Sequence, residues 1–67
     1  MRNGADARAR RIAKGLTLRE VAACHPTAHT PSGIHWLERR ELYDEVYQRL
    51  IDAQDAAGRA KAAKALA

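Results

Sequence analysis

The chain has 67 residues and a net charge of +4, so it is predicted to form one small domain with a correspondingly small core. Nearly half of the residues are nominally hydrophobic, but fifteen of these are alanine and none is phenylalanine. A single cysteine excludes an internal disulfide, the N-terminus lacks the apolar segment of a secretory signal, and no apolar run approaches the roughly 20 residues of a membrane span. We therefore expect a cytoplasmic protein, and its limited core favours dimerisation.

The charges are distributed unevenly along the chain. Residues 1–40 carry eight Lys or Arg against three Asp or Glu, residues 41–57 carry one against five, and residues 58–67 carry three basic residues and no acid. A concentration of basic residues in one part of a domain is typical of a surface that binds phosphate groups. We therefore expect the N-terminal part to provide such a surface and the acidic segment to face away from it.

The N-terminal part begins with residues 1–4, which we expect to be an extended or disordered arm. Residues 5–14 are rich in alanine and arginine, which favour a helix, and Asp6 suits its first turn. Gly15 is the expected C-terminal capping residue. Away from the apolar side of this helix, basic side chains recur at helical spacing and form a stripe of Arg8, Arg11 and Lys14.

A second helix is predicted to begin after Thr17. The run from Thr17 to Glu20 has the pattern of a capping box, in which each side chain accepts a hydrogen bond from the backbone amide of the other residue. Val21 and Ala22 are expected to point inward. The helix should end near Cys24, because Pro26 disfavours helical geometry in the residue before it.

A third helix is predicted after a connection over residues 25–29. Thr30 is a suitable N-cap, and Pro31 suits the first helical position, where a backbone N–H has no partner within the helix. Ile34 and Leu37 share one face and are expected to enter the core. The other faces carry Ser32, His35, Trp36 and Arg39. The sequence shows no internal repeat and no segment that predicts a strand.

A fourth helix is predicted over residues 41–57, where two apolar stripes run side by side. One stripe consists of Leu42, Val46 and Leu50, and the other of Tyr43, Tyr47 and Ile51. Both stripes could close the core of one chain, but we favour a second interpretation, in which Tyr43, Tyr47 and Ile51 form a homodimer interface. Residues 58–67 suit either an extension of this helix or a basic disordered arm. The predicted domain therefore covers residues 5–57, followed by a basic, alanine-rich tail over residues 58–67.

Two segments of the chain resemble a known family. Residues 16–22, followed by Ser32-Gly33-Ile34 and Leu37-Glu38-Arg39, resemble the lambda-repressor/Cro-like (XRE-type) helix-turn-helix pattern. The resemblance covers residues 8–50. Two features depart from the pattern: the connection between the two helices is longer than in the family, and Arg40 stands where the family has a glycine.

The resemblance implies an all-α bundle of four to five helices and a small phage or mobile-element regulator, such as Cro or an anti-CRISPR-associated repressor. Such a protein would act at the nucleoid as a homodimeric repressor, of its own promoter, on a palindromic operator in double-stranded DNA. The residues implied to contact bases, all in the recognition helix over residues 31–39, are Pro31, Ser32, His35, Trp36 and Arg39. The residues expected to contact phosphates are Arg8, Arg11, Lys14, Thr17, Arg19 and Arg40.

Other interpretations remain open at the level of the sequence. Trp36 suits the core as well as a DNA-contacting surface, and Glu38 and Arg39 could simply form a structural ion pair. A different class of function is an antitoxin-like module that binds a partner protein through residues 58–67. A DNA-bending recombination directionality factor is a third possibility.

Metal binding and catalysis are not expected. Four residues have metal-ligand chemistry, namely Cys24, His25, His29 and His35, but their spacing matches no zinc signature. The sequence contains no recognisable combination of a catalytic nucleophile with a general base, no paired carboxylates and no glycine-rich phosphate loop. The sequence therefore predicts neither an enzyme nor a bound cofactor.

Overall fold

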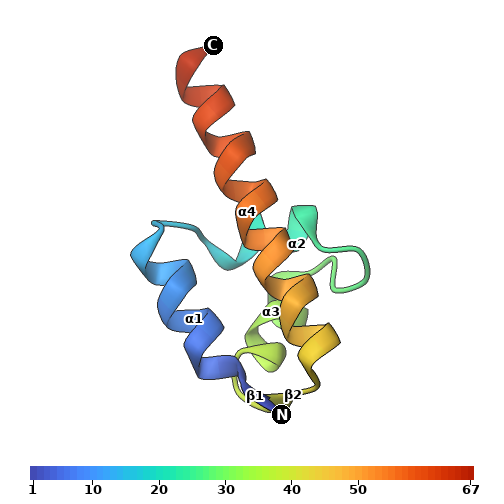
Figure 1. Ribbon diagram of the computed structural model, residues 1–67. Helices are drawn as coiled ribbons and strands as arrows, with labels where there is room; N and C mark the ends of the chain where they lie inside the picture. The colour runs from blue at the N-terminus through green and yellow to red at the C-terminus, as the bar shows by residue number, and fades with distance from the viewer.

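The computed structural model describes all residues, 1–67, and contains four helices and one short two-stranded sheet (Figure 1). The helices are α1 (Gly4–Ala13), α2 (Leu18–Cys24), α3 (Pro31–Leu37) and α4 (Asp44–Leu66), and the strands are β1 (Arg2–Asn3) and β2 (Glu41–Leu42). α2 packs against both α3 and α4, and α1 also packs on α4. The predicted helical class is confirmed, whereas the prediction of a chain without strands is wrong.

α1 begins at Gly4 and ends at Ala13. At its start, the side-chain oxygen Oδ1 of Asn3 accepts a hydrogen bond from the backbone amide of Ala5 at 2.9 Å. After its end, Gly15 adopts a φ of 68°, the left-handed conformation that favours glycine. The predicted first helix and its termination by Gly15 are therefore confirmed.

The starts of α2 and α3 are also capped by the residues that the sequence predicts. The amide of Glu20 donates to Oγ1 of Thr17 at 3.1 Å, and the amide of Thr17 donates to Oε1 of Glu20 at 2.8 Å, which completes the predicted capping box. That second bond holds the pKa of Glu20 below its ordinary value of 4.5. At α3, Oγ1 of Thr30 accepts from the amide of Gly33 at 3.1 Å, and Pro31 occupies the first position as expected.

The connection between α2 and α3 is organised by His25, whose side chain is buried. Its ring nitrogen Nδ1 accepts hydrogen bonds from the backbone amides of Thr27 at 3.2 Å and Ala28 at 2.9 Å. These bonds satisfy two loop amides and fix the path of the chain from α2 toward Thr30. Sequence reasoning treated residues 25–29 only as a longer connection and missed this role of the histidine.

The first residues form β1 and not the independent arm that we expected. Arg2 pairs with Leu42, and Asn3 pairs with Glu41, in an antiparallel register. The guanidinium carbon of Arg2 lies 4.1 Å from the centroid of the Tyr47 ring, which is a cation–π contact. Each strand has only two residues, so neither has the alternating pattern that would reveal it in the sequence.

Gly4 marks the closest approach between the start of α1 and the chain that leaves α3. Its amide donates to the carbonyl oxygen of Arg40 at 2.9 Å. A Cβ atom at this position would lie 2.7 Å from the Arg40 oxygen and would also overlap the carbonyl oxygen of Leu37. Only glycine leaves room for this contact between backbones.

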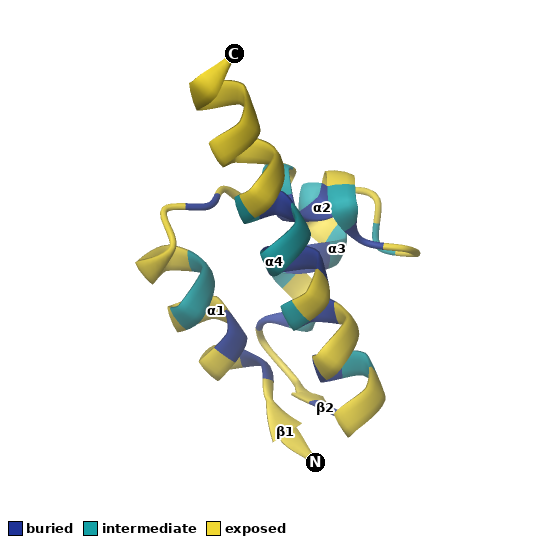
Figure 2. Ribbon diagram, turned by 45° about the horizontal axis from the view of Figure 1, so that its top comes forward, coloured by how far each residue is buried: buried dark blue, intermediate teal, exposed yellow.

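The core lies between α2 and the helices packed against it, α3 and α4, and extends to the contact of α1 with α4 (Figure 2). Its buried hydrophobic residues are Ala7, Leu16, Val21, Ala22, Ile34, Leu42, Tyr47, Leu50, Ala53 and Ala57. The prediction that Val21, Ala22 and Ile34 point inward is confirmed, and Leu37 is half-buried against the same cluster. The alanines let the helices come close together, which partly compensates for the small number of bulky apolar residues.

A buried glutamine joins α1 to α4. Gln54 is completely buried, and its Nε2 donates to the carbonyl oxygen of Ala7 at 2.7 Å. Its Oε1 accepts from Nη1 of Arg10 at 2.9 Å, and Nη2 of Arg10 reaches Oδ1 of Asp55 at 2.8 Å. The hydrogen bond from Arg10 holds the pKa of Asp55 below its ordinary value of 3.8.

α4 continues past the body of the domain as a projecting helix, with residues 59–67 all exposed (Figures 1 and 2). Lys61 anchors the base of this projection, because its Nζ donates to the carbonyl oxygen of Gly15 at 2.7 Å and lies 3.3 Å from Oε1 of Glu20. Of the two expectations for residues 58–67, the helix extension is therefore the one observed. No helix in the chain combines the length and the apolar character needed to cross a membrane.

Candidate nucleic-acid interface

The outer face of α3 is formed by side chains that point away from the core. Ser32 is exposed, and Pro31 and His35 are half-buried, while Ile34 is fully buried on the opposite side of the helix. Trp36 is 62% exposed, so it belongs to the surface and not to the core. Its ring lies edge-on to that of His35, with 6.1 Å between the ring centroids. The face therefore combines a large apolar ring with hydrogen-bonding groups.

Two arginines continue this face beyond the C-terminal end of α3. Arg39 lies one helical turn after His35, and its Nη1 donates to the carbonyl oxygen of His35 at 3.3 Å. Arg40 follows and is also exposed. Neither arginine forms an ion pair, so both charges are available to an external anion.

Arg11 belongs to the interior of the domain and not to its surface. Its Nε and Nη2 donate to Oε2 and Oε1 of Glu38 at 2.7 and 3.1 Å, and its Nη1 donates to the carbonyl oxygen of Leu16 at 2.8 Å. The side chain of Glu38 is completely buried, and that of Arg11 is 11% exposed. The predicted phosphate contact of Arg11 is therefore wrong, because each guanidinium nitrogen already has a partner. The suggested pair between Glu38 and Arg39 is also wrong, because both carboxylate oxygens of Glu38 are bound by Arg11 and Arg39 forms no ion pair.

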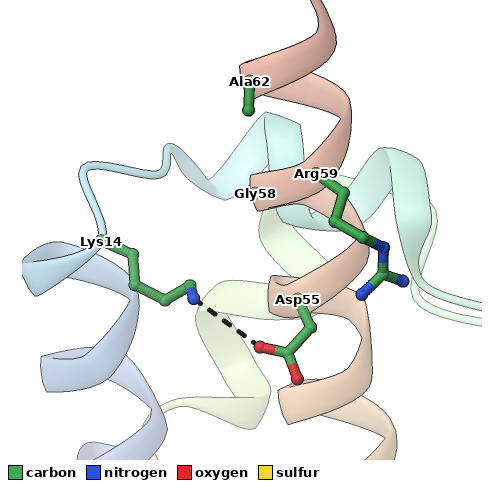
Figure 3. A pocket seen from close by; sticks show the side chains of 5 residues that line it. All are labelled: Lys14, Asp55, Gly58, Arg59 and Ala62. Atoms are coloured by element: carbon green, nitrogen blue, oxygen red, sulfur yellow. Dashed lines mark ion pairs between the residues drawn. The ribbon is translucent and has the colours of Figure 1, made fainter.

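Lys14 is directed toward α4. Its Nζ lies 3.7 Å from Oδ1 of Asp55, and Figure 3 shows its side chain reaching across to that carboxylate. The pocket around this pair is lined by Lys14, Asp55, Gly58, Arg59 and Ala62. The predicted basic stripe on α1 is therefore divided: only Arg8 remains exposed and without an ion pair.

The predicted phosphate contacts on α2 have different surroundings. The amide of Thr17 is occupied by Glu20 in the capping box, so it is not free to bind a phosphate. Arg19 is exposed, and it lines a groove between α2 and α4 together with Lys61 and Lys64. Arg19 forms no ion pair, so its guanidinium group is free to contact a phosphate, whereas the amide of Thr17 is not.

The second apolar stripe of α4 is divided between the core and the surface. Tyr47 is only 8% exposed and its ring is covered by Arg2, so its predicted place in a dimer interface is wrong. Tyr43 is exposed and Ile51 is half-buried. Helical spacing placed these three residues on one stripe, but β1, which lies far away in the sequence, decides which of them is covered.

The residues with metal-ligand chemistry do not gather into a site. No group of three or more His, Cys, Asp or Glu side chains is placed to hold a metal ion. Nδ1 of His25 is occupied by two backbone amides, and Cys24 is a half-buried free thiol.

The stability of the domain is expected to fall with acidification because of His25. Burial lowers the pKa of His25 below its ordinary value of 6.5, and the nearby His29 and Arg49 act in the same direction. The unfolded chain therefore binds a proton near pH 6.5 while the folded chain does not. The contribution is fully present above pH 6.5 and is lost as the pH falls toward the lowered pKa, by up to about 1.4 kcal/mol per pH unit.

Urea denaturation between pH 7.5 and pH 5 measures this effect, and His25→Asn is the matched variant. The Asn oxygen Oδ1 occupies the place of Nδ1 and accepts the same hydrogen bonds, but it does not titrate. We expect His25→Asn to be less stable at pH 7.5, since it fills less space, and to have a flatter pH dependence. An equal slope in both proteins would show that His25 does not cause it.

Fold and surface together define a small, mostly helical domain that displays one helix face with exposed aromatic, polar and unpaired basic side chains. A scan against protein-family models and searches of curated proteins and of solved structures found no match to this chain.

Proposed function

We propose that the protein is a sequence-specific DNA-binding transcriptional regulator, in which α2 and α3 act as a helix-turn-helix and α3 enters the major groove. The outer face of α3 is the observation that carries this proposal. A short capped helix there exposes the only tryptophan of the chain, Trp36, beside His35 and Ser32. Aromatic side chains such as tryptophan are enriched where a protein surface contacts a partner, so the exposed ring suits contact with a partner surface.

The chemistry of this face suits base edges. The Ser32 hydroxyl can donate or accept, and the His35 ring can donate to N7 or O6 of guanine. The indole of Trp36 can pack against a thymine methyl group, as can Pro31 at the start of the helix. The set therefore offers both hydrogen-bonding and apolar contacts within one helical turn or two.

The distribution of charge supports the same proposal. Arg39 and Arg40 lie at the end of the face without an ion pair, and Arg8 on α1 is likewise unpaired. Unpaired arginines can bind DNA phosphates and release the counterions that surround them. The acidic residues gather instead in the chain from 41 to 57, mostly within α4.

The proposed regulator is a homodimeric repressor in the cytoplasm that occupies an inverted-repeat operator at its own promoter. Two-fold symmetry would place the two α3 helices about 34 Å apart, one turn of DNA. With Tyr47 in the core, the exposed Tyr43 is the best remaining candidate for the contact between subunits.

Light scattering should find a dimer for the natural protein and a monomer for Tyr43→Asp. If the natural protein is a monomer both free and bound to DNA, the proposed dimer is wrong.

Replacing His35 or Trp36 by alanine is expected to weaken binding to the preferred DNA site at least about 10-fold, because good base contacts contribute 1–3 kcal/mol each. The site is first selected from a random library of duplex DNA, and affinities are then measured by fluorescence anisotropy. His29→Ala is the matched control, since His29 is exposed in the loop outside α3. If both variants bind the selected site as tightly as the control does, α3 is not the recognition helix.

A second candidate function is a protein-interaction module. The observation that favours it is the exposed projection of α4, which forms one wall of the groove with α2. Removing residues 59–67 should then abolish recovery of a stoichiometric partner protein while leaving DNA binding unchanged. Loss of DNA binding without loss of a partner would exclude this candidate.

A further inference from the structure

A crevice lies between the start of α1 and the C-terminal end of α3. It is a shallow, open depression of about 380 Å³, lined by Asn3, Ala5, Arg8, Glu38 and Arg39. The backbone hydrogen bond from Gly4 to Arg40 joins the same two segments of the chain. The crevice is therefore a fixed feature of the fold, formed where two segments distant in the sequence meet.

Two of the residues that line the crevice are arginines without an ion pair. Arg8 and Arg39 are both exposed, and no carboxylate lies within 4.0 Å of either guanidinium group. The one acidic residue in the wall, Glu38, is already bound by two nitrogens of Arg11, so its charge is balanced from inside. Arg8 from α1 and Arg39 from the turn after α3 therefore line one crevice, and neither charge is paired with a carboxylate.

The side-chain donors in this space are the two guanidinium groups and the amide nitrogen Nδ2 of Asn3. The first amides of α1 are occupied: that of Gly4 donates to the carbonyl oxygen of Arg40, and that of Ala5 donates to Asn3. A guanidinium has five N–H donors, and at Arg39 only one nitrogen, Nη1, is used, at 3.3 Å. Planar forks of this kind match the geometry of phosphate oxygens.

We propose that this crevice binds one backbone phosphate of duplex DNA between Arg8 and Arg39. The inference rests on the proposed function, and it changes the role of Arg39 from a base contact to a phosphate contact. The position supports DNA as the source of the phosphate, because Arg39 follows His35 by four residues and continues the outer face of α3 past the end of that helix. A phosphate held there would fix α3 in depth and orientation while the bases are read by residues before it.

The experiment measures the affinity for two duplexes, a selected site and a random sequence, at salt concentrations from 50 to 300 mM. The variants are Arg8→Gln, Arg39→Gln and the double substitution, with Arg59→Gln as the matched control. Arg59 is exposed on α4 and lines a different pocket, so its substitution makes the same change of charge outside the crevice. Circular dichroism checks that all variants are folded.

A shared phosphate predicts a specific salt dependence. The double variant should lower the slope of log K against log salt by about 0.9, the value for one phosphate, and both duplexes should lose affinity equally. Arg59→Gln should leave both slopes unchanged. A slope reduced by about 1.8 would place the arginines on separate phosphates and overturn the proposal. A loss confined to the selected site would return Arg39 to base reading, and it would also overturn the proposal.

Failure of the crevice and failure of the proposed function give different results. If the natural protein binds duplex DNA and His35→Ala weakens that binding, but the arginine variants behave as the natural protein, only the crevice is excluded. If the natural protein binds neither duplex at 50 mM salt, the DNA-binding function is excluded together with the crevice.

Discussion

Replacing Glu38 by glutamine is expected to lower the free energy of unfolding by about 3 kcal/mol, which is a large part of the stability of so small a domain. The side chain of Glu38 is completely buried and accepts two hydrogen bonds from Arg11, at 2.7 and 3.1 Å. Glutamine keeps the size but removes the charge, so the guanidinium of Arg11 stays nearly buried without a counter-ion. Such a loss costs far more than the pair contributes when it is intact.

Urea denaturation followed by circular dichroism measures this change, with Glu45→Gln as the control. Glu45 is exposed on α4 and forms no ion pair, so its substitution should change stability by less than about 0.5 kcal/mol. Replacing both partners, Arg11→Met with Glu38→Leu, should recover most of the loss, because no unpaired charge then remains. Equal stability of Glu38→Gln and Glu45→Gln would show that the pair is not important.

Replacing Gly4 by alanine is expected to lower the free energy of unfolding by about 2–3 kcal/mol, as overpacking against rigid atoms does. The added Cβ would lie 2.7 Å from the carbonyl oxygen of Arg40 and overlap that of Leu37. Both obstacles are backbone atoms, so no side chain can rotate away. α1 must shift, which strains the pairing of β1 with β2 and widens the crevice beside Arg8.

Gly58→Ala is the matched control for this substitution. Gly58 lies inside α4, and a Cβ there would meet only the flexible side chain of Lys14, at 3.7 Å or more. Because alanine favours helices over glycine, we expect Gly58→Ala to raise stability, by about 0.5–1 kcal/mol. Thermal unfolding measures both variants. If their stabilities change in the same direction relative to the natural protein, the steric explanation for Gly4 is wrong.

The local features of the fold could be predicted from the sequence because they depend on neighbouring residues. The capping box of Thr17 and Glu20, the cap at Thr30 and the termination of α1 at Gly15 all lie where expected. Each of them joins atoms within a few residues of one another. The outward position of Ser32 and the inward position of Ile34 follow in the same way from the period of a helix.

The features that the sequence left undecided depend on contacts between distant residues. Arg11 resembles Arg8 in the sequence, since both fall on one basic stripe, but only Arg11 meets a buried carboxylate, 27 residues further along the chain. Tyr47 resembles Tyr43, but only Tyr47 is covered by Arg2 from β1. A helical period assigns a residue to a face, and it cannot tell which faces another segment will cover.

The sequence by itself therefore determined the first three helices, the caps at Thr17 and Thr30, the separation of basic and acidic segments and the outward position of Ser32. Only the tertiary structure decided that Trp36 is exposed, that His25 holds the connection between α2 and α3, and that Arg8 and Arg39 share a crevice. The physical reason is the range of the interactions. Capping and helix formation act over one or two turns, whereas burial and charge pairing depend on which distant atoms arrive at the same place.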